Sequence, residues 1–126
     1  WLGLSVYGMQ FREARWTGFR EVMAGPYAEL CRLDPEKPVI VAEWGVGEFP
    51  AAGSKADFIR EALTGMQADY PRVKAAVFWH ERWQNPDETY SNLRVNSSPE
   101  ALAAFREEIA APFWRDRPLL HPAPRP

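Results

Sequence analysis

The residue best suited to chemistry is Glu43, which directly follows the apolar run at residues 39–42 and precedes Gly45. In folds of alternating strands and helices, functional groups gather where strands end and loops begin. A carboxylate held there by a rigid strand, partly shielded from water, suits the nucleophile of a retaining glycosidase. A structural glutamate paired with an arginine fits the same pattern, and the residues alone leave both interpretations open.

Two aromatic residues end the other apolar runs. Tyr7 closes the run at residues 1–7, where its hydroxyl could donate to Glu43 or to backbone. Trp79 closes the run at residues 73–79 and could form the apolar floor under a sugar ring, or a core contact at a strand end. Trp44, His80 and Trp83 complete the predicted substrate contacts. A solvated loop or a hydrogen-bonding role explains His80 and Trp83 equally well.

Neither a metal nor a cofactor is expected. The two histidines, His80 and His121, have no ligand-like spacing with carboxylates. No glycine-rich phosphate loop follows any of the apolar runs, which argues against nucleotides. Cys31 is the single cysteine, so neither an intrachain disulfide nor a cysteine metal cluster can form.

Composition limits the partners. The chain has 126 residues, 46% of them apolar and 25% charged, and a net charge of −2 without charge blocks. This balance supports a globular core and gives no reason to expect nucleic acid or a membrane span. Aromatic residues make up 13%, which suits sugar rings as well as a core. The chain opens inside a strand pattern without a visible leader, and we therefore expect an excised fragment or a processed chain.

The periodicity predicts strands at residues 1–7, 39–42 and 73–79. A helix is expected from Trp16 to about Leu30, kinked or split at residues 25–26, where proline follows glycine. Ser54 with Asp57 predicts a capping box for a second helix, and Ser97 with Glu100 predicts one for a third. Residues 80–96 are predicted as a long loop, and residues 112–126 as a proline-rich tail.

This order of strand, helix, strand, helix, strand, helix predicts an α/β fold with a parallel sheet and right-handed crossovers. The units are either part of an eight-stranded barrel or a small open sheet of the flavodoxin type. Three parallel strands alone leave two unpaired edges and one poorly covered face. That cost favours the barrel fragment, which in isolation could self-associate.

Several segments resemble glycoside hydrolase family 26, the β-mannanase family. The run KPVIVAEWG at residues 37–45 resembles the motif of its seventh barrel strand, and residues 1–7 resemble the sixth. Similar segments follow in the family's order at residues 55–59, 70–75, 77–79 and 93–98. The resemblance covers residues 1–111, which are identified as the C-terminal part of a (β/α)8 barrel.

The resemblance implies retaining hydrolysis of β-linked polysaccharide, with Glu43 as nucleophile, Tyr7 as its hydrogen-bonding partner and Trp79 as a stacking platform. The family's acid/base glutamate follows the fourth strand, which these residues do not include, so the chain alone is expected to be inactive. The missing part of the barrel would be its partner, and the parent protein is expected to be secreted or periplasmic. The alternative is a barrel that binds glycans without cleaving them, in polysaccharide synthesis or export.

Overall fold

The computed structural model describes residues 1–115 and 117, so most of the predicted proline-rich tail at residues 112–126 lies outside the described residues. The main elements alternate: β1 (Leu2–Tyr7), α1 (Phe19–Leu33), β2 (Val39–Gly45), α2 (Lys55–Ala68) and β3 (Val73–Phe78). A hairpin of β4 (Arg82–Gln84) and β5 (Tyr90–Asn92) follows, and then α3 (Pro99–Ile109). The predicted α/β class and the three main strands are confirmed.

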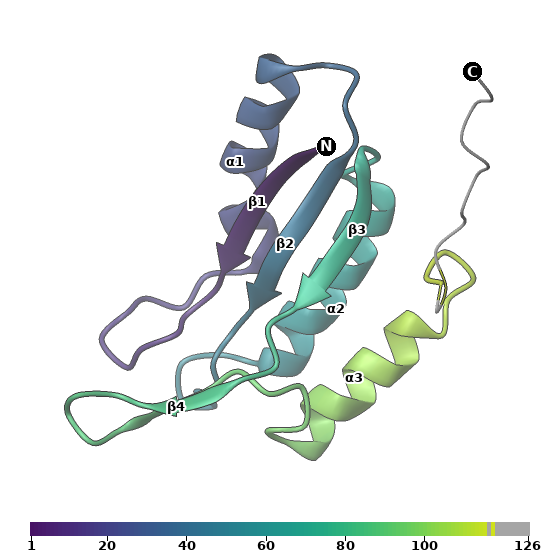
Figure 1. Ribbon diagram of the computed structural model, residues 1–126. Helices are drawn as coiled ribbons and strands as arrows, with labels where there is room; N and C mark the ends of the chain where they lie inside the picture. The colour runs from purple at the N-terminus through teal and green to yellow at the C-terminus, as the bar shows by residue number, and fades with distance from the viewer. Residues whose placement is uncertain (116, 118–126) are drawn as a thin grey trace.

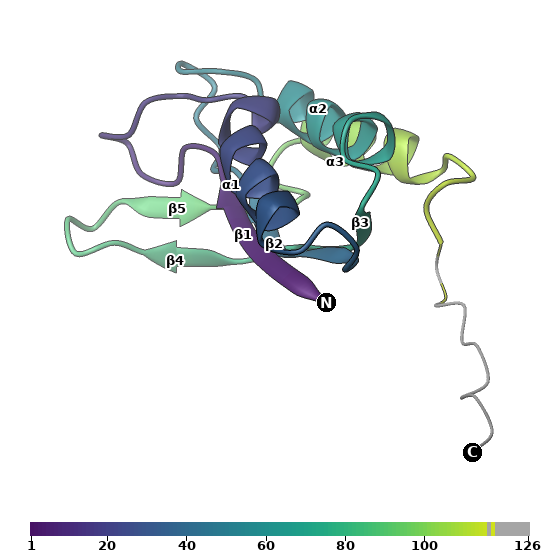
Figure 2. The same ribbon diagram turned by 90° about the horizontal axis from the view of Figure 1, so that it is seen from above.

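The sheet has the strand order β1-β2-β3, and both neighbouring pairs are parallel. The strands therefore lie in the sheet in the same order as in the sequence, because β2 pairs with β1 and β3 pairs with β2. The helices lie on one face of this sheet, as the view from above shows (Figure 2). Within the described residues, the opposite face carries no helix (Figures 1 and 2).

The core fills the space between the sheet and the helices. Phe19 of α1 is fully buried and makes edge-to-face contacts with three other rings, those of Trp44, Phe58 and Tyr70. On the far side, Phe78 of β3 packs against Phe105 of α3, with ring centroids 5.6 Å apart. Aromatic rings thus join all three helices to one face of the sheet.

Helix α1 runs unbroken from Phe19 to Leu33 with Pro26 inside it, so the helix is not split at the proline. Proline removes one backbone donor, but packing on both sides holds the helix together. Met23 is fully buried before the proline, and after it the Tyr27 ring lies 4.9 Å from the Tyr70 ring. The apolar stripe therefore outweighs the local preference of the proline.

One of the two predicted helix starts is confirmed, and the other is displaced by one residue. Ser54 caps α2 as predicted, accepting a hydrogen bond from the Asp57 backbone N–H. For α3 the predicted cap is one residue early: Ser98 is the N-cap and accepts from the Ala101 N–H. The Ser97 hydroxyl instead donates to Glu48, in the loop after β2. A serine pair offers two candidate caps, and this long-range contact selects between them.

Residues 80–96 are not the featureless loop predicted from the sequence, because they contain the antiparallel β4–β5 hairpin. Its strands have three residues each, too few to show an alternating pattern. Its turn closes through local contacts of Asp87, whose side chain accepts from the Thr89 backbone N–H and hydroxyl. Figure 1 shows the hairpin extending beyond the ends of the β2 and β3 arrows.

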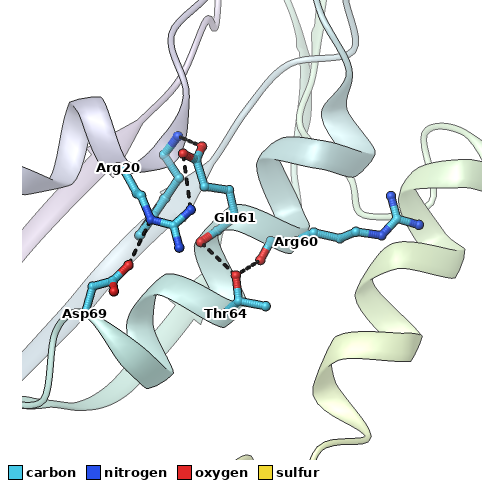
Figure 3. Close-up of polar contacts among 6 residues, drawn as sticks. Arg20, Arg60, Glu61, Thr64 and Asp69 are labelled. Atoms are coloured by element: carbon cyan, nitrogen blue, oxygen red, sulfur yellow. Dashed lines mark hydrogen bonds and ion pairs between the residues drawn. The ribbon is translucent and has the colours of Figure 1, made fainter.

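A polar network ties α1 to α2 (Figure 3). The Glu61 carboxylate accepts from the Phe19 backbone N–H at 2.6 Å, at the first residue of α1. Arg20 lies between Glu61, at 3.6 Å, and Asp69, to which its Nε donates at 2.8 Å. Gly18 has no capping side chain, so the glutamate of the neighbouring helix supplies the acceptor that a helix start requires.

Candidate functional site at the carboxyl end of the sheet

Glu43 and Tyr7 meet at the carboxyl ends of β2 and β1. The Tyr7 hydroxyl donates a hydrogen bond of 2.7 Å to Glu43 Oε2. Both side chains are partly exposed, while their neighbours Val6 and Trp44 are buried in the core. Since successive side chains of a strand point to opposite faces, the pair lies on the face that carries no helix. The structure therefore joins the two residues, and their catalytic roles stay predictions.

A β-bulge aims Glu43 at this face. Leu4 of β1 lies opposite Val41, but the next residue, Ser5, lies opposite Glu43, so β2 has one extra residue at Ala42. The pairing with β3 shows the same irregularity between Val41 and Trp44. Strict alternation from Val41 would send Glu43 into the core and Trp44 out of it. Bulges re-aim side chains in this way next to functional sites.

The surroundings of the Tyr7–Glu43 pair shift the pKa of the tyrosine hydroxyl. Burial, the hydrogen bond to Glu43 and the nearby negative charge all raise the pKa of the Tyr7 hydroxyl, burial most strongly. The hydroxyl therefore stays protonated and remains a donor to the carboxylate at any ordinary pH. A short hydrogen bond from a neutral donor fixes the orientation of the carboxylate and leaves its second oxygen, Oε1, for another contact.

Trp79 follows the last residue of β3, and its backbone N–H donates to Trp44 O at 2.8 Å. Its side chain is 39% exposed, and Val77, two residues earlier, is 50% exposed. Phe78 between them packs into the core, so both exposed side chains belong to the face without helices. An apolar surface thus continues along β3 beside the strand that carries Glu43.

Trp44 does not contact the candidate site, which corrects the prediction that it binds substrate. Its side chain is only 1% exposed and packs against the rings of Phe19 and Phe78. The bulge explains this burial, because the extra residue shifts the alternation of β2 by one position and turns Trp44, instead of Glu43, toward the core. The tryptophan holds the strand to the helices while its neighbour Glu43 faces the opposite side.

His80 and Glu81 are both engaged with backbone. His80 Nδ1 accepts a hydrogen bond from the Val95 N–H at 3.1 Å, and Glu81 Oε1 accepts from the Arg82 N–H at 2.8 Å. These contacts hold the segment that links β3 to the hairpin. The His80 side chain retains its Nε2 atom for other partners, and its role toward a substrate stays a prediction.

Trp83 lies on the hairpin and packs edge-to-face on Phe11, which follows β1, at 6.3 Å between ring centroids. On the same hairpin the Arg82 guanidinium lies 3.8 Å from the centre of the Tyr90 ring. The buried Ser91 hydroxyl donates to Gln10 O at 2.7 Å and binds the hairpin to the loop after β1. The loop after β1 and the β4–β5 hairpin therefore pack together, partly through aromatic side chains, beyond the carboxyl end of the sheet.

The role of Lys55 was not predicted from the sequence. The resemblance placed it only within the segment 55–59, yet the side chain is 2% exposed and its Nζ donates to two backbone carbonyls, Asn92 O and Arg94 O. A lysine at the first residue of a helix is ordinarily solvated, so no local pattern marks it. Its opposition to the helix dipole is the one signal available.

Two hollows lie away from the Tyr7–Glu43 pair. One of about 380 Å³ lies between the starts of α1 and α2, and its lining includes Trp16, Arg20 and Glu61. Another of about 550 Å³ lies beside the starts of α2 and α3, with Glu48 and Ser98 in its lining. Neither is lined by the candidate nucleophile. Neither hollow therefore belongs to the candidate site.

Residues 1–115 and 117 include neither a cluster of metal-binding side chains nor a membrane-spanning helix. In that part of the chain, no three histidine, cysteine, aspartate or glutamate side chains gather closely enough to hold a metal ion. In the same part, no helix is both long and apolar enough to cross a membrane.

A known protein is similar to this chain over most of its length. The chain is 39% identical over 98 residues to Endoglucanase H of Acetivibrio thermocellus. The match takes in 78% of this chain but spans only 10% of the length of that relative. No family model matches the chain. The similarity therefore relates these residues to a segment of a glycoside hydrolase.

Proposed function

We propose that this chain is the C-terminal part, strands six to eight, of a (β/α)8 barrel that hydrolyses β-linked polysaccharide with retention of configuration. The 2.7 Å hydrogen bond between Tyr7 and Glu43 carries the proposal. A retaining glycosidase needs an oriented carboxylate on a rigid strand end, with a donor that stays protonated beside it. The similarity to a segment of an endoglucanase supports the same reaction class.

The arrangement of the sheet supports a barrel over a flavodoxin-like domain. A doubly wound sheet has helices on both faces and reverses its strand order. Here the order β1-β2-β3 follows the sequence, and the helices lie on one face (Figure 2). In a barrel the face without helices becomes the interior, and the outer edges of β1 and β3 pair with further strands. Residues 1–111 would then form the barrel portion.

In the proposed reaction, Glu43 attacks the anomeric carbon and forms a covalent glycosyl ester as the leaving oxygen departs. Tyr7 positions the attacking carboxylate. A second carboxylic acid, about 5–5.5 Å from Glu43, protonates the leaving oxygen and then activates water to release the sugar. We assign that acid to the part of the barrel that these residues do not include, because Glu81 is bonded to the backbone N–H of Arg82.

Exposed aromatic side chains near the strand ends would hold the sugar chain. Trp79 offers an exposed apolar face beside β2, and the half-buried Trp83 offers part of its ring on the hairpin. Sugar rings stack on such faces through their C–H groups. His80 would contribute a polar contact between the two. We propose β-glucan or β-mannan as substrate, and a parent protein that acts outside the cytoplasm.

Chemical rescue in the parent protein tests the role of Glu43. The variant Glu43→Ala should lose turnover on β-glucan and β-mannan but cleave dinitrophenyl β-glycosides when azide is added. A lost nucleophile gives the α-glycosyl azide, whereas a lost acid/base gives the β-glycosyl azide, because azide then attacks the glycosyl-enzyme. Glu81→Ala is the matched control and should retain turnover. Formation of the β-azide by Glu43→Ala would exclude a nucleophile at this position.

The isolated chain should bind but not hydrolyse polysaccharide, since it supplies one carboxyl group of the pair. The alternative is a glycan-binding barrel that has no hydrolytic role, for which the exposed Trp79 and the hairpin aromatics are the specific observation. The parent protein distinguishes the two. A binding barrel shows no turnover with Glu43 intact, and Glu43→Ala leaves its glycan affinity unchanged.

A further inference from the structure

Lys55 is a buried cation outside the proposed catalytic pair. It is the first residue of α2, it is 2% exposed, and its Nζ donates to Arg94 O at 2.8 Å and to Asn92 O at 3.2 Å. Asn92 is the last residue of β5, and Arg94 lies in the segment that leads out of the hairpin. A single side chain thus joins the start of a helix to a segment almost forty positions later in the chain.

The position is unfavourable for a positive charge. Burial removes the ammonium from water, and the start of a helix carries a partial positive charge of its own. Burial lowers the pKa of Lys55 to about 8, and the nearby Glu48 carboxylate opposes that shift. A neutral apolar side chain of similar length would avoid these costs. Unlike an apolar side chain, however, the lysine donates hydrogen bonds to two backbone carbonyls.

The segment that Lys55 holds touches the ends of both inner strands. The Leu93 N–H donates to Glu81 O after β3, and the Leu93 side chain packs closely on Gly45 at the end of β2. Asn92 O also accepts from the Glu48 N–H, and the Val95 N–H donates to His80 Nδ1. Residues 92–95 are therefore a junction between the strand ends and the hairpin.

We propose that Lys55 is a positioning residue, whose ammonium fixes residues 92–94 and thereby holds the aromatic hairpin at a set place relative to the strand end that carries Glu43. The hairpin itself bonds to the body of the chain at few other points, among them the contact of Ser91 with Gln10 O. This role rests on the proposed function, because it concerns where the hairpin stands beside that site.

The other hydrogen bonds of the two carbonyls distinguish a positioning role for Lys55 from a general contribution to the stability of the fold. Asn92 O accepts a second bond from the Glu48 N–H, and Arg94 O accepts one from the Ser97 N–H. Loss of the lysine would therefore leave each carbonyl with a backbone partner. Removing the charge also relieves its burial. The variant Lys55→Met should thus stay folded, with the loss confined to the junction and the hairpin.

Hydrogen exchange of the full chain, followed by NMR, tests this prediction without any glycan. In Lys55→Met, exchange of the Glu48, Leu93 and Val95 amides should accelerate at least tenfold. The Val39 and Val73 amides, which are bonded to carbonyls at the opposite end of the sheet, should be unchanged. Lys74→Met is the matched control, since Lys74 bonds one carbonyl, Pro71 O, at that opposite end. It should leave the junction amides unchanged.

A second measurement on the unaltered chain needs no variant. The sequence has three lysines, so their ammonium signals are readily assigned, and Lys55 should give a slowly exchanging Nζ signal at neutral pH while Lys37 and Lys74 exchange rapidly. Equal acceleration of all amides in Lys55→Met, no acceleration at the junction, or rapid exchange of the Lys55 ammonium would overturn the proposal. Because no outcome depends on hydrolysis, the catalytic role of Glu43 stands or falls separately.

Discussion

The hydroxyl of Tyr7 reaches Glu43 Oε2 at 2.7 Å across 36 positions of sequence. The contact depends on two adjacent parallel strands ending at the same sheet edge and on the bulge at Ala42. Tyr7 itself lies opposite Gly45, so the bond runs diagonally back along the neighbouring strand.

Replacing this tyrosine should reduce turnover more than binding. In the parent protein, Tyr7→Phe removes one donor to the proposed nucleophile and should lower kcat by roughly 10- to 100-fold, the size expected for a hydrogen bond to a charged group. KM for the same β-glycan should change little. Steady-state kinetics of this variant and of the control variant Tyr70→Phe measures both quantities. Tyr70→Phe, in a buried ring packed on Tyr27, serves as control and should stay within about twofold of the unaltered enzyme.

Lys55 should make stability rise with pH in the mildly alkaline range. Its folded-state pKa is about 8, below the ordinary 10.5, so between these values the unfolded chain binds more protons than the folded one. Stability then increases with pH by up to ~1.4 kcal/mol per unit. Urea unfolding from pH 7.5 to about 9.5 should show this rise. Lys55→Met should lack it and Lys74→Met should keep it; equal slopes for all three would refute the buried cation.

Glu61 should stabilise the start of α1. Its carboxylate accepts from the Phe19 N–H, so Glu61→Ala should cost ~1–2 kcal/mol of unfolding free energy, the range of a lost helix cap. Glu29→Ala, at an exposed position of the same helix, should change stability by less than ~0.5 kcal/mol. Denaturant unfolding of both variants provides the measurement. Equal effects would mean that the contact contributes nothing specific.

The isolated chain should self-associate through the face without helices. Val77 on edge strand β3 is 50% exposed there, next to an unpaired sheet edge. Sedimentation velocity should show oligomers that grow with concentration, and Val77→Lys should shift the chain toward monomer because charge on an edge strand blocks pairing. Leu33→Lys, at an exposed apolar residue ending α1, should not. A monomer at all concentrations would contradict this expectation.

The alternating order of strands and helices could be predicted because each element carries its own period. The run at residues 39–42 has the continuous apolar pattern of a buried parallel strand, and the stripe around Phe58 and Ile59 marks a helix face. Helix α1 passed through Pro26 against prediction because burial of Met23 and Tyr27 depends on distant partners. Local propensity contains no information about such partners.

The site was predictable in part. Position at a strand end identified Tyr7 and Glu43 as candidates, but the bulge that points Glu43 away from the core depends on register with both neighbours. The burial of Trp44 follows from the same bulge and was therefore missed. The hairpin was also missed, because strands of three residues show no alternating pattern. The contacts of Lys55 were missed because they join segments that are far apart in sequence.

The extra residue in β2 decides which of two neighbouring side chains lies in the core, and therefore how each position tolerates substitution. Glu43 and Trp44 are neighbours in the chain, yet one faces the open side and the other lies in the core. Random substitutions at these two codons should therefore separate cleanly: variants of Trp44 lost through misfolding, variants of Glu43 folded but altered in chemistry. The candidate position can thus change while the packing of the strand against the helices is preserved.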